Sequence, residues 1–486
     1  MSAPEALDVM RELAVDVLCD FSLAEVVDLV AYADDTSIVV ANAGGASRLS
    51  RVDPEALAEV LRGHDPIASQ DPMAFSTLAA ELADPSPPND RNSYPWAAER
   101  LISLFAAPAA PDIAVVHTGR HYFPDRGGHR GEHGSLSVVQ SRAPLILSGP
   151  DVLGRGMIPV AARVVDVAPT LAWLAGTPLA SLGDMDGQAL VDLLVPRPDS
   201  RVIGLLWDGC NSNSLYSLAA AGELPSVARL LARGCALTGG AVAEFPSVTL
   251  VNHTCALTGV GPGRHGIVNN AYFDRSVGAQ RLTNDARTWH RWAEWLTPGV
   301  RTVFERVEGP TACVNEPADS GASYSTFELV RASGDDDGVS PNDSRLPSPR
   351  EDPHATQEYV ETDKDYAWSS SVDGIGLTQM LDLWPTLADA PRLSWWNTLL
   401  TDTGHHSGGP HSPIAHAAMR DADRRLGVFL DHLERIGALD STTILLTADH
   451  GSEGADPNCV GDWDAPLREA GVQFRDEANG FLYLGV

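Results

Sequence analysis

Residues 202–208 read VIGLLWD, an uninterrupted apolar run that ends in an acidic residue. A continuous apolar run of this length, unlike an alternating one, is typical of a parallel strand buried on both faces. Four further runs have a similar form: 112–117 (DIAVVH), 143–148 (APLILS), 399–402 (LLTD) and 443–449 (TILLTAD). We therefore predict that these five segments are buried strands of a largely parallel sheet.

Helical patterns alternate with these runs. The clearest extends from Ser412, which can cap a helix, through Pro413, which suits the first helical position, to Gly437, which can end it. Apolar residues recur within it at helical spacing and predict a face packed on the core: Leu426, Phe429, Leu430, Leu433 and Ile436. The alternation predicts an α/β fold, a doubly wound sheet with helices on both faces.

Other segments have the composition of peripheral parts. Residues at about 20–105 contain a strand pair (VVDLVAYADDTSIVVANA) and helical patterns, which predict a small appended α+β lobe. Residues 333–353 (SGDDDGVSPNDSRLPSPREDP) are rich in Asp, Ser and Pro, as an exposed, mobile loop is. Residues 196–200 (PRPDS) predict a linker, and residues at about 285–395 a cap or insert.

Length and charge limit the classes of function. The 486 residues are enough for a large α/β core plus a smaller lobe. With 34 basic and 65 acidic residues, the formal net charge of −31 argues against docking on long nucleic acid or on an anionic membrane. A small anionic substrate stays compatible with this charge, because bound metal ions can reverse the local potential.

The N-terminal segment, the length of the apolar runs and the cysteines predict the location of the protein in the cell. The N-terminus lacks a basic segment followed by a continuous apolar one, so we expect no signal peptide. A run of about 18 apolar residues is absent, so we expect no membrane span. The six cysteines have no CxxC spacing and lie mostly in apolar surroundings, which predicts reduced, largely buried thiols in a cytoplasmic protein.

Candidate chemical groups follow the predicted strands. The chemistry of a parallel sheet gathers at the carboxyl ends of its strands, where Asp208, Asp402 and Asp449 would lie. Taken alone, an Asp at a strand end is commonly a cap. Residues 245–252 (FPSVTLVN) come next, then His253 and a Gly-rich turn. A Thr at the start of a helix can direct its hydroxyl at an anion, and metal coordination can remove its proton without a general base.

Two further segments combine carboxylates with imidazoles. In TDTGHHSGGPH, Asp402 is followed by His405 and His406, and a carboxylate and an imidazole on one loop can share a divalent ion such as zinc. The alternative is a polar loop with incidental histidines. Asp449 and His450 follow another apolar run, and this pair is weak evidence by itself.

Asp208, FPSVTLVNH, DTGHH and ADHG, in that order, resemble the type I phosphodiesterase/nucleotide pyrophosphatase family of the alkaline phosphatase superfamily. The resemblance implies an alkaline phosphatase-like αβα sandwich around a mostly parallel sheet. It also implies two divalent metal ions, expected to be Zn²⁺, although Asp/His sites also accept Mn²⁺ or Fe. Four residues would hold the first ion: Asp208, Thr249, Asp449 and His450.

The resemblance also implies roles for single residues. Asp402 and His406 would hold the second ion; His406 is preferred to His405 because it keeps the family's four-residue step and the following Gly-Pro. Thr249 would be the nucleophile, and Asn252 would hold a phosphoryl oxygen.

The family pattern requires one more histidine after the Asp-His-Gly motif, but this chain has none after His450. Residues 131–136 (GEHGSL), followed by APLILSGP, VDVAPTL and Asp186-Gly187, resemble the family's usual C-terminal segment instead. His133 would therefore complete the second ion site. His117, His121 and His129 are nearby alternatives, but only His133 has the Glu-His-Gly-Ser context.

This displaced motif predicts a circular permutation. Residues 1–195 would correspond to the family's C-terminal part, residues 201–486 to its N-terminal part, and residues 196–200 to the new junction. The new ends would lie at a surface connection of the smaller lobe, where such changes are tolerated. The terminal FLYLGV segment could then lead into a helix near residues 4–18.

The resemblance implies hydrolysis of phosphate diesters or nucleotide pyrophosphates through a phospho-threonine intermediate at Thr249. FPSVTLVNH favours diesters, and the chain lacks both an Asp-Ser-Ala nucleophile motif and a Cys-x-Pro-x-Arg sulfatase signature. A phosphonoacetate-type C–P hydrolase and a phosphomonoesterase are the enzyme alternatives. An inactive metal-binding protein with a regulatory or structural role is the alternative of another class. The expected partner is a small phosphate ester, and the sequence does not determine the oligomeric state.

Overall fold

The structure, a computed structural model, describes residues 3–52, 58–83, 91–124, 127–333 and 349–486. Most of the predicted mobile loop at 333–353 lies outside these residues. The central sheet has eight strands in the order β17-β16-β18-β11-β19-β8-β12-β9. Their bounds are β17 Tyr324–Ser325, β16 Thr311–Val314, β18 Leu393–Thr398, β11 Arg201–Trp207, β19 Thr442–Thr447, β8 Leu145–Ser148, β12 Gly234–Leu237 and β9 Gly156–Ile158.

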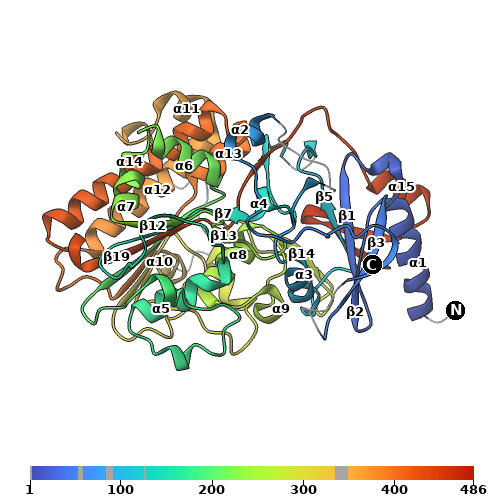
Figure 1. The fold of residues 1–486 in the computed structure, drawn as a ribbon, viewed down its shortest axis with the longest axis horizontal. Coiled ribbons are helices and arrows are strands. Elements are labelled where there is room, and N and C mark those ends of the chain that lie inside the picture. The colour runs from blue at the N-terminus through green and yellow to red at the C-terminus, as the bar shows by residue number, and fades with distance from the viewer. Residues whose placement is uncertain (1–2, 53–57, 84–90, 125–126, 334–348) are drawn as a thin grey trace.

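This sheet is mostly parallel. All neighbours from β17 to β19 pair in parallel, β8 runs antiparallel to both of its neighbours, and β9 is parallel to β12. Helices cover both faces (Figure 1). One face carries α5 (Val167–Leu174) and α8 (Thr249–Thr258), and the other carries α6 (Ser212–Ala220), α7 (Pro225–Ala232), α12 (Lys364–Leu383) and α14 (Pro413–Arg435). The predicted α/β sandwich around a mostly parallel sheet is confirmed.

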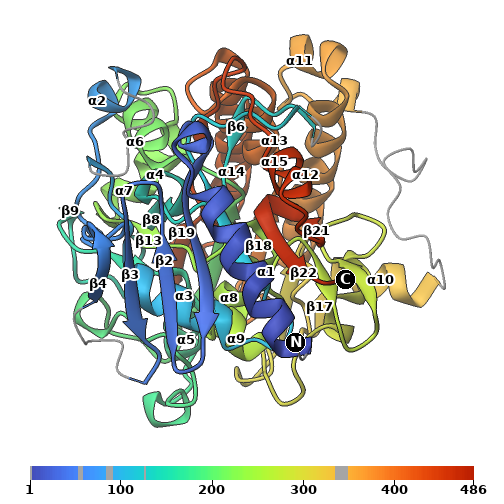
Figure 2. The ribbon, with the colours of Figure 1, turned by 90° about the vertical axis from the view of Figure 1, so that its right-hand side faces the viewer.

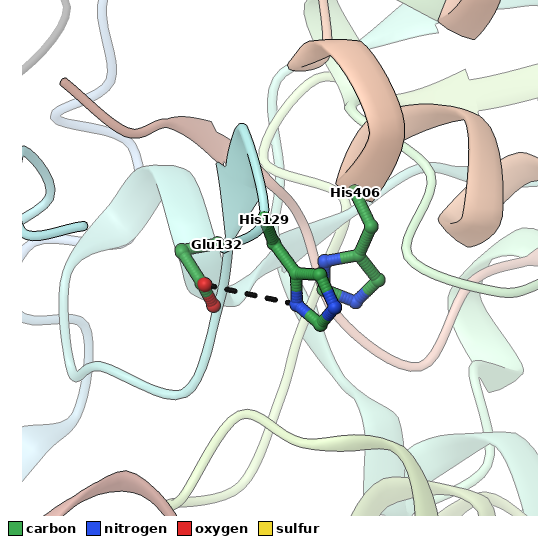
Figure 3. Close-up of side chains that lie close together, drawn as sticks. All are labelled: His129, Glu132 and His406. Atoms are coloured by element: carbon green, nitrogen blue, oxygen red, sulfur yellow. Dashed lines mark ion pairs between the residues drawn. The ribbon is translucent and has the colours of Figure 1, made fainter. Parts of the chain in front are cut away.

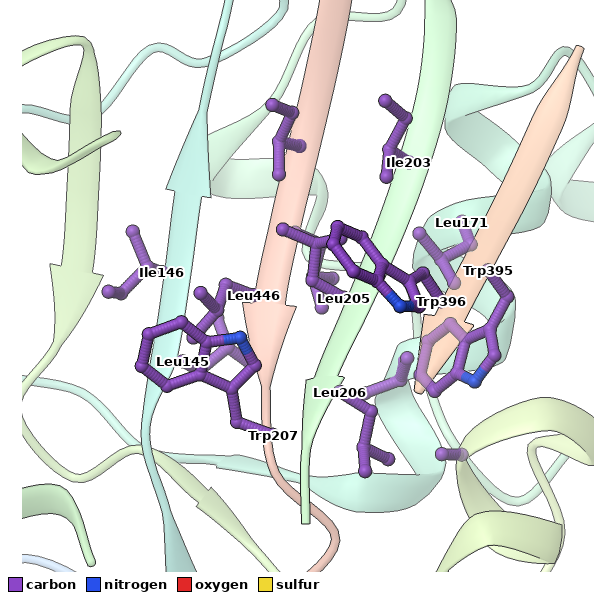
Figure 4. Packing of buried hydrophobic residues seen from close by; sticks show 14 of the residues in the cluster. Leu145, Ile146, Leu171, Ile203, Leu205, Leu206, Trp207, Trp395, Trp396 and Leu446 are labelled. Atoms are coloured by element: carbon purple, nitrogen blue, oxygen red, sulfur yellow. The ribbon is translucent and has the colours of Figure 1, made fainter. Parts of the chain in front are cut away.

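Buried apolar side chains hold the layers together. Leu205, Leu206 and Trp207 of β11 are at most 2% exposed and pack with apolar residues from the neighbouring strands and α5 (Figure 4). Removing apolar surface from water stabilises such a core by about 25 cal/mol per Å². Gly204 leaves room for an aromatic ring, since a Cβ at this position would lie only 2.3 Å from a ring atom of Trp395.

A second, antiparallel sheet forms the smaller lobe, with strands in the order β21-β22-β5-β1-β2-β3-β4. The bounds are β21 Phe474–Glu477, β22 Phe481–Leu484, β5 Ile113–His117, β1 Val27–Asp34, β2 Ser37–Ala41, β3 Gly45–Ser50 and β4 Glu59–Gly63. Both ends of the chain contribute to this lobe. Helix α1 (Ala3–Leu18) contacts β1, β22 and α15 (Asp464–Glu469), and the two termini lie on the same side of the molecule (Figure 2).

Several predicted elements are confirmed. Residues 202–207 and 443–447 are strands of the central sheet, residues 27–41 contain a hairpin, and α1 matches the helix expected near residues 4–18. In α14, the Ser412 hydroxyl accepts a hydrogen bond from the backbone N–H of Ala415, and Gly437 follows the helix with φ +69°.

Of the other three predicted strands, two are buried strands but not parallel strands of the central sheet, and the third is not a strand. Residues 113–117 lie in the antiparallel lobe, and residues 145–148 join the central sheet but run antiparallel. An apolar run signals burial, but it does not specify neighbour or direction. Residues 400–402 begin a helix, α13 (Leu400–Gly408), and the strand before it ends at Thr398. This strand, LSWWNT, contains polar residues, so it was not recognised as an apolar run.

Smaller elements complete the described fold. The remaining helices are α2 Leu78–Ala83, α3 Ala97–Phe105, α4 Val138–Ser141, α9 Pro262–His265, α10 Thr326–Ser333 and α11 Gln357–Thr362. The remaining strands are β6 Gly131–Glu132, β7 Arg142–Ala143, β10 Ala162–Arg163, β13 Ala241–Val242, β14 Ala271–Asp274, β15 Ala279–Leu282 and β20 Glu453–Gly454. None of the described helices combines the length and the apolar character needed to cross a bilayer. All six cysteines lie in the described residues and are free thiols, and five of them are buried.

Candidate metal centre

Three carboxylates meet at one edge of the central sheet. Asp208 directly follows β11, Asp449 follows β19, and Asp402 lies in the first turn of α13, just after β18. These three strands are parallel neighbours, so their carboxyl ends emerge together. Asp208 and Asp449 are 5% and 0% exposed, and the backbone N–H of Gly209 donates to Asp449 Oδ1 at 2.9 Å.

Three histidines join the carboxylates. The Nε2 atom of His406 lies 3.0 Å from Asp402 Oδ2, and that of His450 lies 3.0 Å from Asp449 Oδ2. The ring of His133 stacks on His450, with 3.8 Å between centroids and 17° between planes. The short ladder of β6 and β20 pairs Glu132 with Glu453 and so holds the loop of His133 beside that of His450.

Backbone carbonyls orient all three rings. The Nδ1 atoms of His133, His406 and His450 lie 3.0, 2.8 and 2.9 Å from the carbonyl oxygens of Ser247, Gly131 and Gly451. A carbonyl only accepts, so in the neutral tautomer the proton is on Nδ1 and the Nε2 lone pair is free to bind a cation. Metal-binding histidines are commonly fixed in this way.

Several buried polar atoms lack the partners that burial requires. Among the described residues, Asp208 Oδ1 and Asp402 Oδ1 make no hydrogen bond, and Asp449 Oδ2 and His450 Nε2 lie 3.0 Å apart without the alignment of a hydrogen bond. Such atoms are costly to bury unless something satisfies them. Carboxylate oxygens and imidazole nitrogens are the donors that Zn²⁺ and related divalent ions prefer, so the residues fit metal ions.

The pKa values of the cluster residues are shifted by burial and by the charges of their neighbours. Burial, reinforced by the neighbouring Asp449 carboxylate, raises the pKa of Asp208 to about 7. Burial lowers the pKa of His133 well below its ordinary value. Burial also disfavours the charged form of His406, but the adjacent Asp402 outweighs this effect and raises the pKa of His406 to about 10. Crowded acids of this kind are stabilised by a bound cation.

The donor atoms fall into three sets, and within each set they lie within 4.8 Å of one another. The sets are Asp208, His253 and Asp449; His133, Asp402 and His450; and His129, Glu132 and His406. The structure thus brings the expected ligands together but groups them differently from the motif resemblance. His450 lies between the first two sets, and His405 belongs to none of the three.

His129 and Glu132, of the third donor set, lie in the same segment as His133. His129 Nδ1 lies 3.7 Å from Glu132 Oε1, and its ring centroid lies 4.0 Å from that of His406 (Figure 3). From the sequence, His129 was predicted only as an alternative to His133, and no role was predicted for Glu132. The other two alternatives belong to none of the three donor sets: His117 Nε2 lies 3.2 Å from the His133 carbonyl, and His121 Nε2 lies 3.0 Å from that of Gly461.

Thr249 lies where two cavities meet. It is the first residue of α8, a helix N-terminus suited to an anion. One cavity, of about 150 Å³, is lined partly by Trp289 and Trp368, and the other, of about 190 Å³, partly by His129 and Glu132. Three residues line both cavities: Thr249, Asn284 and Asp402.

The prediction for Asn252 needs correction. Its side chain is 0% exposed and lines neither of these cavities. Its amide nitrogen lies 3.1 Å from the carbonyl oxygens of Pro246 and Val248, and its Oδ1 accepts from the backbone N–H of Glu244 at 2.7 Å. The amide therefore fixes the loop before α8 and is not available to a phosphoryl oxygen.

Asn270 is the asparagine beside Thr249. It lines the 190 Å³ cavity together with Thr249, and its Oδ1 accepts from the backbone N–H of Leu250 at 3.0 Å. This bond uses the acceptor of the amide and leaves its N–H groups for a ligand. The sequence signal that could have identified it is the Asn pair after the Gly-rich turn, GIVNNA.

Comparison with known proteins gives partial matches. Venom phosphodiesterase from Macrovipera lebetinus is 24% identical over 254 residues, which are 50% of this chain and 24% of that protein. Alkaline phosphatase PafA from Elizabethkingia meningoseptica is 32% identical over 108 residues, which are 22% of this chain and 19% of that protein. The chain therefore spans a quarter or less of the length of these two relatives.

Two solved structures are similar over about half of the chain. Murine ectonucleotide pyrophosphatase/phosphodiesterase 5 has 18% identity and a TM-score of 0.34, covering 52% of this chain and 57% of that one. Phosphonoacetate hydrolase from Sinorhizobium meliloti 1021, in complex with phosphonoformate, has 21% identity and a TM-score of 0.34, covering 55% and 59%.

A family model gives the longest match. The model of type I phosphodiesterase/nucleotide pyrophosphatase matches residues 202–485, which are more than half of the chain. The matched region contains the three strand-end carboxylates, Thr249, His406 and His450, whereas His133 lies outside it. The chain belongs to the type I phosphodiesterase/nucleotide pyrophosphatase family.

Proposed function

We propose that this protein is a two-metal hydrolase of phosphate diesters or nucleotide pyrophosphates with Thr249 as its nucleophile. Family membership supports hydrolysis of phosphate esters. The observation that carries the finer proposal is the position of Thr249, at a helix N-terminus between two cavities and beside the carboxylates Asp208 and Asp402.

The ligands are proposed as two sets. Asp208, Thr249, Asp449 and His450 would hold one ion, and Asp402, His406 and His133 the other. When bound, the two ions would lower the pKa of the Thr249 hydroxyl and of a water molecule and would offset charge on the phosphoryl oxygens. Zn²⁺ is the expected metal because the donor set combines carboxylates and imidazoles, although Mn²⁺ and Fe use the same donors.

The chain's own groups would then bind and cleave the ester. The helix dipole at the N-terminus of α8 and the amide of Asn270 favour a phosphoryl group beside Thr249. Thr249 Oγ attacks phosphorus, the Oγ–P bond forms, and the ester P–O bond breaks as the alcohol leaves with a proton. Water then attacks the same phosphorus, breaks the Oγ–P bond and releases a phosphate monoester.

The two cavities support a diester or pyrophosphate substrate. A diester carries two substituents on its phosphorus, and Thr249 lines two cavities, each of which would take one of them. None of the described residues that line these cavities is Lys or Arg. A diester has one negative charge and needs fewer cationic partners than a monoester dianion, so this lining favours the diester.

The test compares variants and substrates of the metal-replete protein. Wild type should cleave bis-p-nitrophenyl phosphate faster than p-nitrophenyl phosphate, and Thr249→Ala should lose at least about 10³-fold in kcat. Thr249→Ser is the matched control, since it keeps a nucleophilic oxygen. Full activity in Thr249→Ala would exclude this nucleophile. Turnover of phosphonoacetate in preference to both esters would identify a C–P hydrolase instead.

We also infer that the chain is circularly permuted relative to its family. His133 lies in the cluster although it precedes the matched region 202–485. Strand β22 pairs with β5, and α1 contacts β22, so the two ends belong to one lobe. Terminal positions close together at a surface are where permutation is tolerated.

A further inference from the structure

His253 is a buried histidine of the first donor set that neither of the two proposed ligand sets includes. It is 1% exposed and lies one helical turn after Thr249 on α8. Residues four apart project from the same face of a helix, so His253 is directed to the same side as Thr249. Its Nε2 lies 3.5 Å from Asp208 Oδ2 and 3.6 Å from Asp449 Oδ2.

These two distances distinguish a hydrogen bond from shared coordination. An N–H···O hydrogen bond spans about 2.7–3.2 Å, and among the described residues His253 Nε2 makes no such bond. Two donor atoms bound tetrahedrally at about 2.0–2.2 Å from zinc lie roughly 3.3–3.6 Å apart. The spacing between His253 and each carboxylate is therefore that of two ligands around one ion.

Glu316 orients the His253 ring. Its Oε2 lies 2.9 Å from His253 Nδ1, and the Glu316 side chain is 0% exposed. Glu316 is itself held, because Oε2 accepts from Trp395 Nε1 at 3.0 Å and Oε1 from the backbone N–H of Ala318 at 3.0 Å. A carboxylate on Nδ1 leaves the Nε2 lone pair for a metal and makes the imidazole a stronger ligand.

We propose that His253 is a ligand, through Nε2, of the ion held by Asp208 and Asp449, and that Glu316 is its positioning residue. This inference rests on the proposed two-metal site but not on the reaction catalysed there. Thr249 and His253, on one face of α8, would then approach the same ion.

The first experiment measures metal binding without reference to turnover. Metal-free protein is titrated with Zn²⁺ by calorimetry, and the bound metal is counted by mass spectrometry. Wild type should bind two ions. His253→Ala should bind one of them at least about 10²-fold more weakly, and Glu316→Gln should weaken the same ion by about 10-fold. His265→Gln is the matched control: His265 is also fully buried but belongs to none of the three donor sets.

A second variant covers the case in which His253→Ala folds poorly. In His253→Cys, a thiolate at a ligand position would give a cobalt–thiolate charge-transfer band when the protein is loaded with Co²⁺, compared with Co²⁺-loaded wild type. Two ions bound by His253→Ala with wild-type affinity, or a Co²⁺-loaded His253→Cys without the band, would overturn the proposal. Failure of the wild type itself to bind metal would overturn the two-metal function as well, so the two failures are distinguishable.

Discussion

The two sheets of the molecule differ in where their strands end. In the central sheet, β18, β11 and β19 are parallel neighbours, and all three carry a carboxylate just past the same edge. In the smaller lobe every pairing is antiparallel, so successive loops are divided between opposite edges. The lobe reaches the metal cluster through the loop after β5, which carries His129, Glu132 and His133. Parallel neighbours place the groups that follow them at one edge of a sheet, whereas antiparallel neighbours divide such groups between two opposite edges.

The largest effect should come from removing the lobe's contribution to the cluster. His133→Ala should lose one of two metal ions and about 10³-fold in kcat/KM, because about 4 kcal/mol of transition-state stabilisation depends on that ion. Metal analysis and diesterase assays measure both effects. His121→Ala is the control from the same loop, since His121 contacts the Gly461 carbonyl outside the cluster. Unchanged metal content in His133→Ala would mean that the central sheet holds both ions without the lobe.

The second comparison concerns stability. Leu206 in β11 is 0% exposed, so Leu206→Ala should lower the free energy of unfolding by about 2–5 kcal/mol. Leu61 on the edge strand β4 is 41% exposed, so Leu61→Ala should change it by less than about 0.5 kcal/mol. Urea denaturation followed by circular dichroism measures both. Equal losses would mean that the buried Leu206 contributes no more to stability than an exposed leucine on an edge strand.

A third test distinguishes the role of Asn252, in α8, from that of Asn270. Asn270→Ala should lose about 10²-fold in kcat/KM with little change in Tm, since its amide is proposed to contact the phosphoryl group. Asn252→Ala should instead cost about 1–3 kcal/mol of stability, because it leaves buried backbone groups without a partner. Paired kinetics and thermal melts give the answer, and the reverse pattern would restore the role first predicted for Asn252.

The smallest effect should follow a rearrangement of chain order. Joining residue 486 to residue 3 by a short Gly-Ser linker and opening the chain at 196–200 should change stability by only about 1 kcal/mol. Both ends are held near the new joint by the pairing of β22 with β5 and the packing of α1. Metal content and diesterase activity should stay close to those of the original order. A product that does not fold would count against a permuted relationship.

The sequence by itself determined those helices and strands whose hydrophobic pattern and end-capping residues lie within one short segment. The continuous apolar runs of β11 and β19, and the cap, proline and glycine of α14, predicted their type correctly and their limits to within two residues. Hydrophobic periodicity and helix capping depend on residues that are close together in the chain, so both can be identified before the fold is known. The motif order around Asp208, Thr249 and Asp449 likewise identified the family.

Only the tertiary structure decided which strands pair and which polar groups meet. Residues 113–117 and 145–148 looked like parallel core strands, but an apolar run does not record its partner or its direction. The motif pointed to Asn252 alone, and only the structure shows that Asn252 is hydrogen-bonded to residues 244–248 whereas Asn270 lines the cavity beside Thr249. His253 and Glu132 acquired candidate roles in the same way, because coordination depends on where atoms converge in space and not on spacing along the chain.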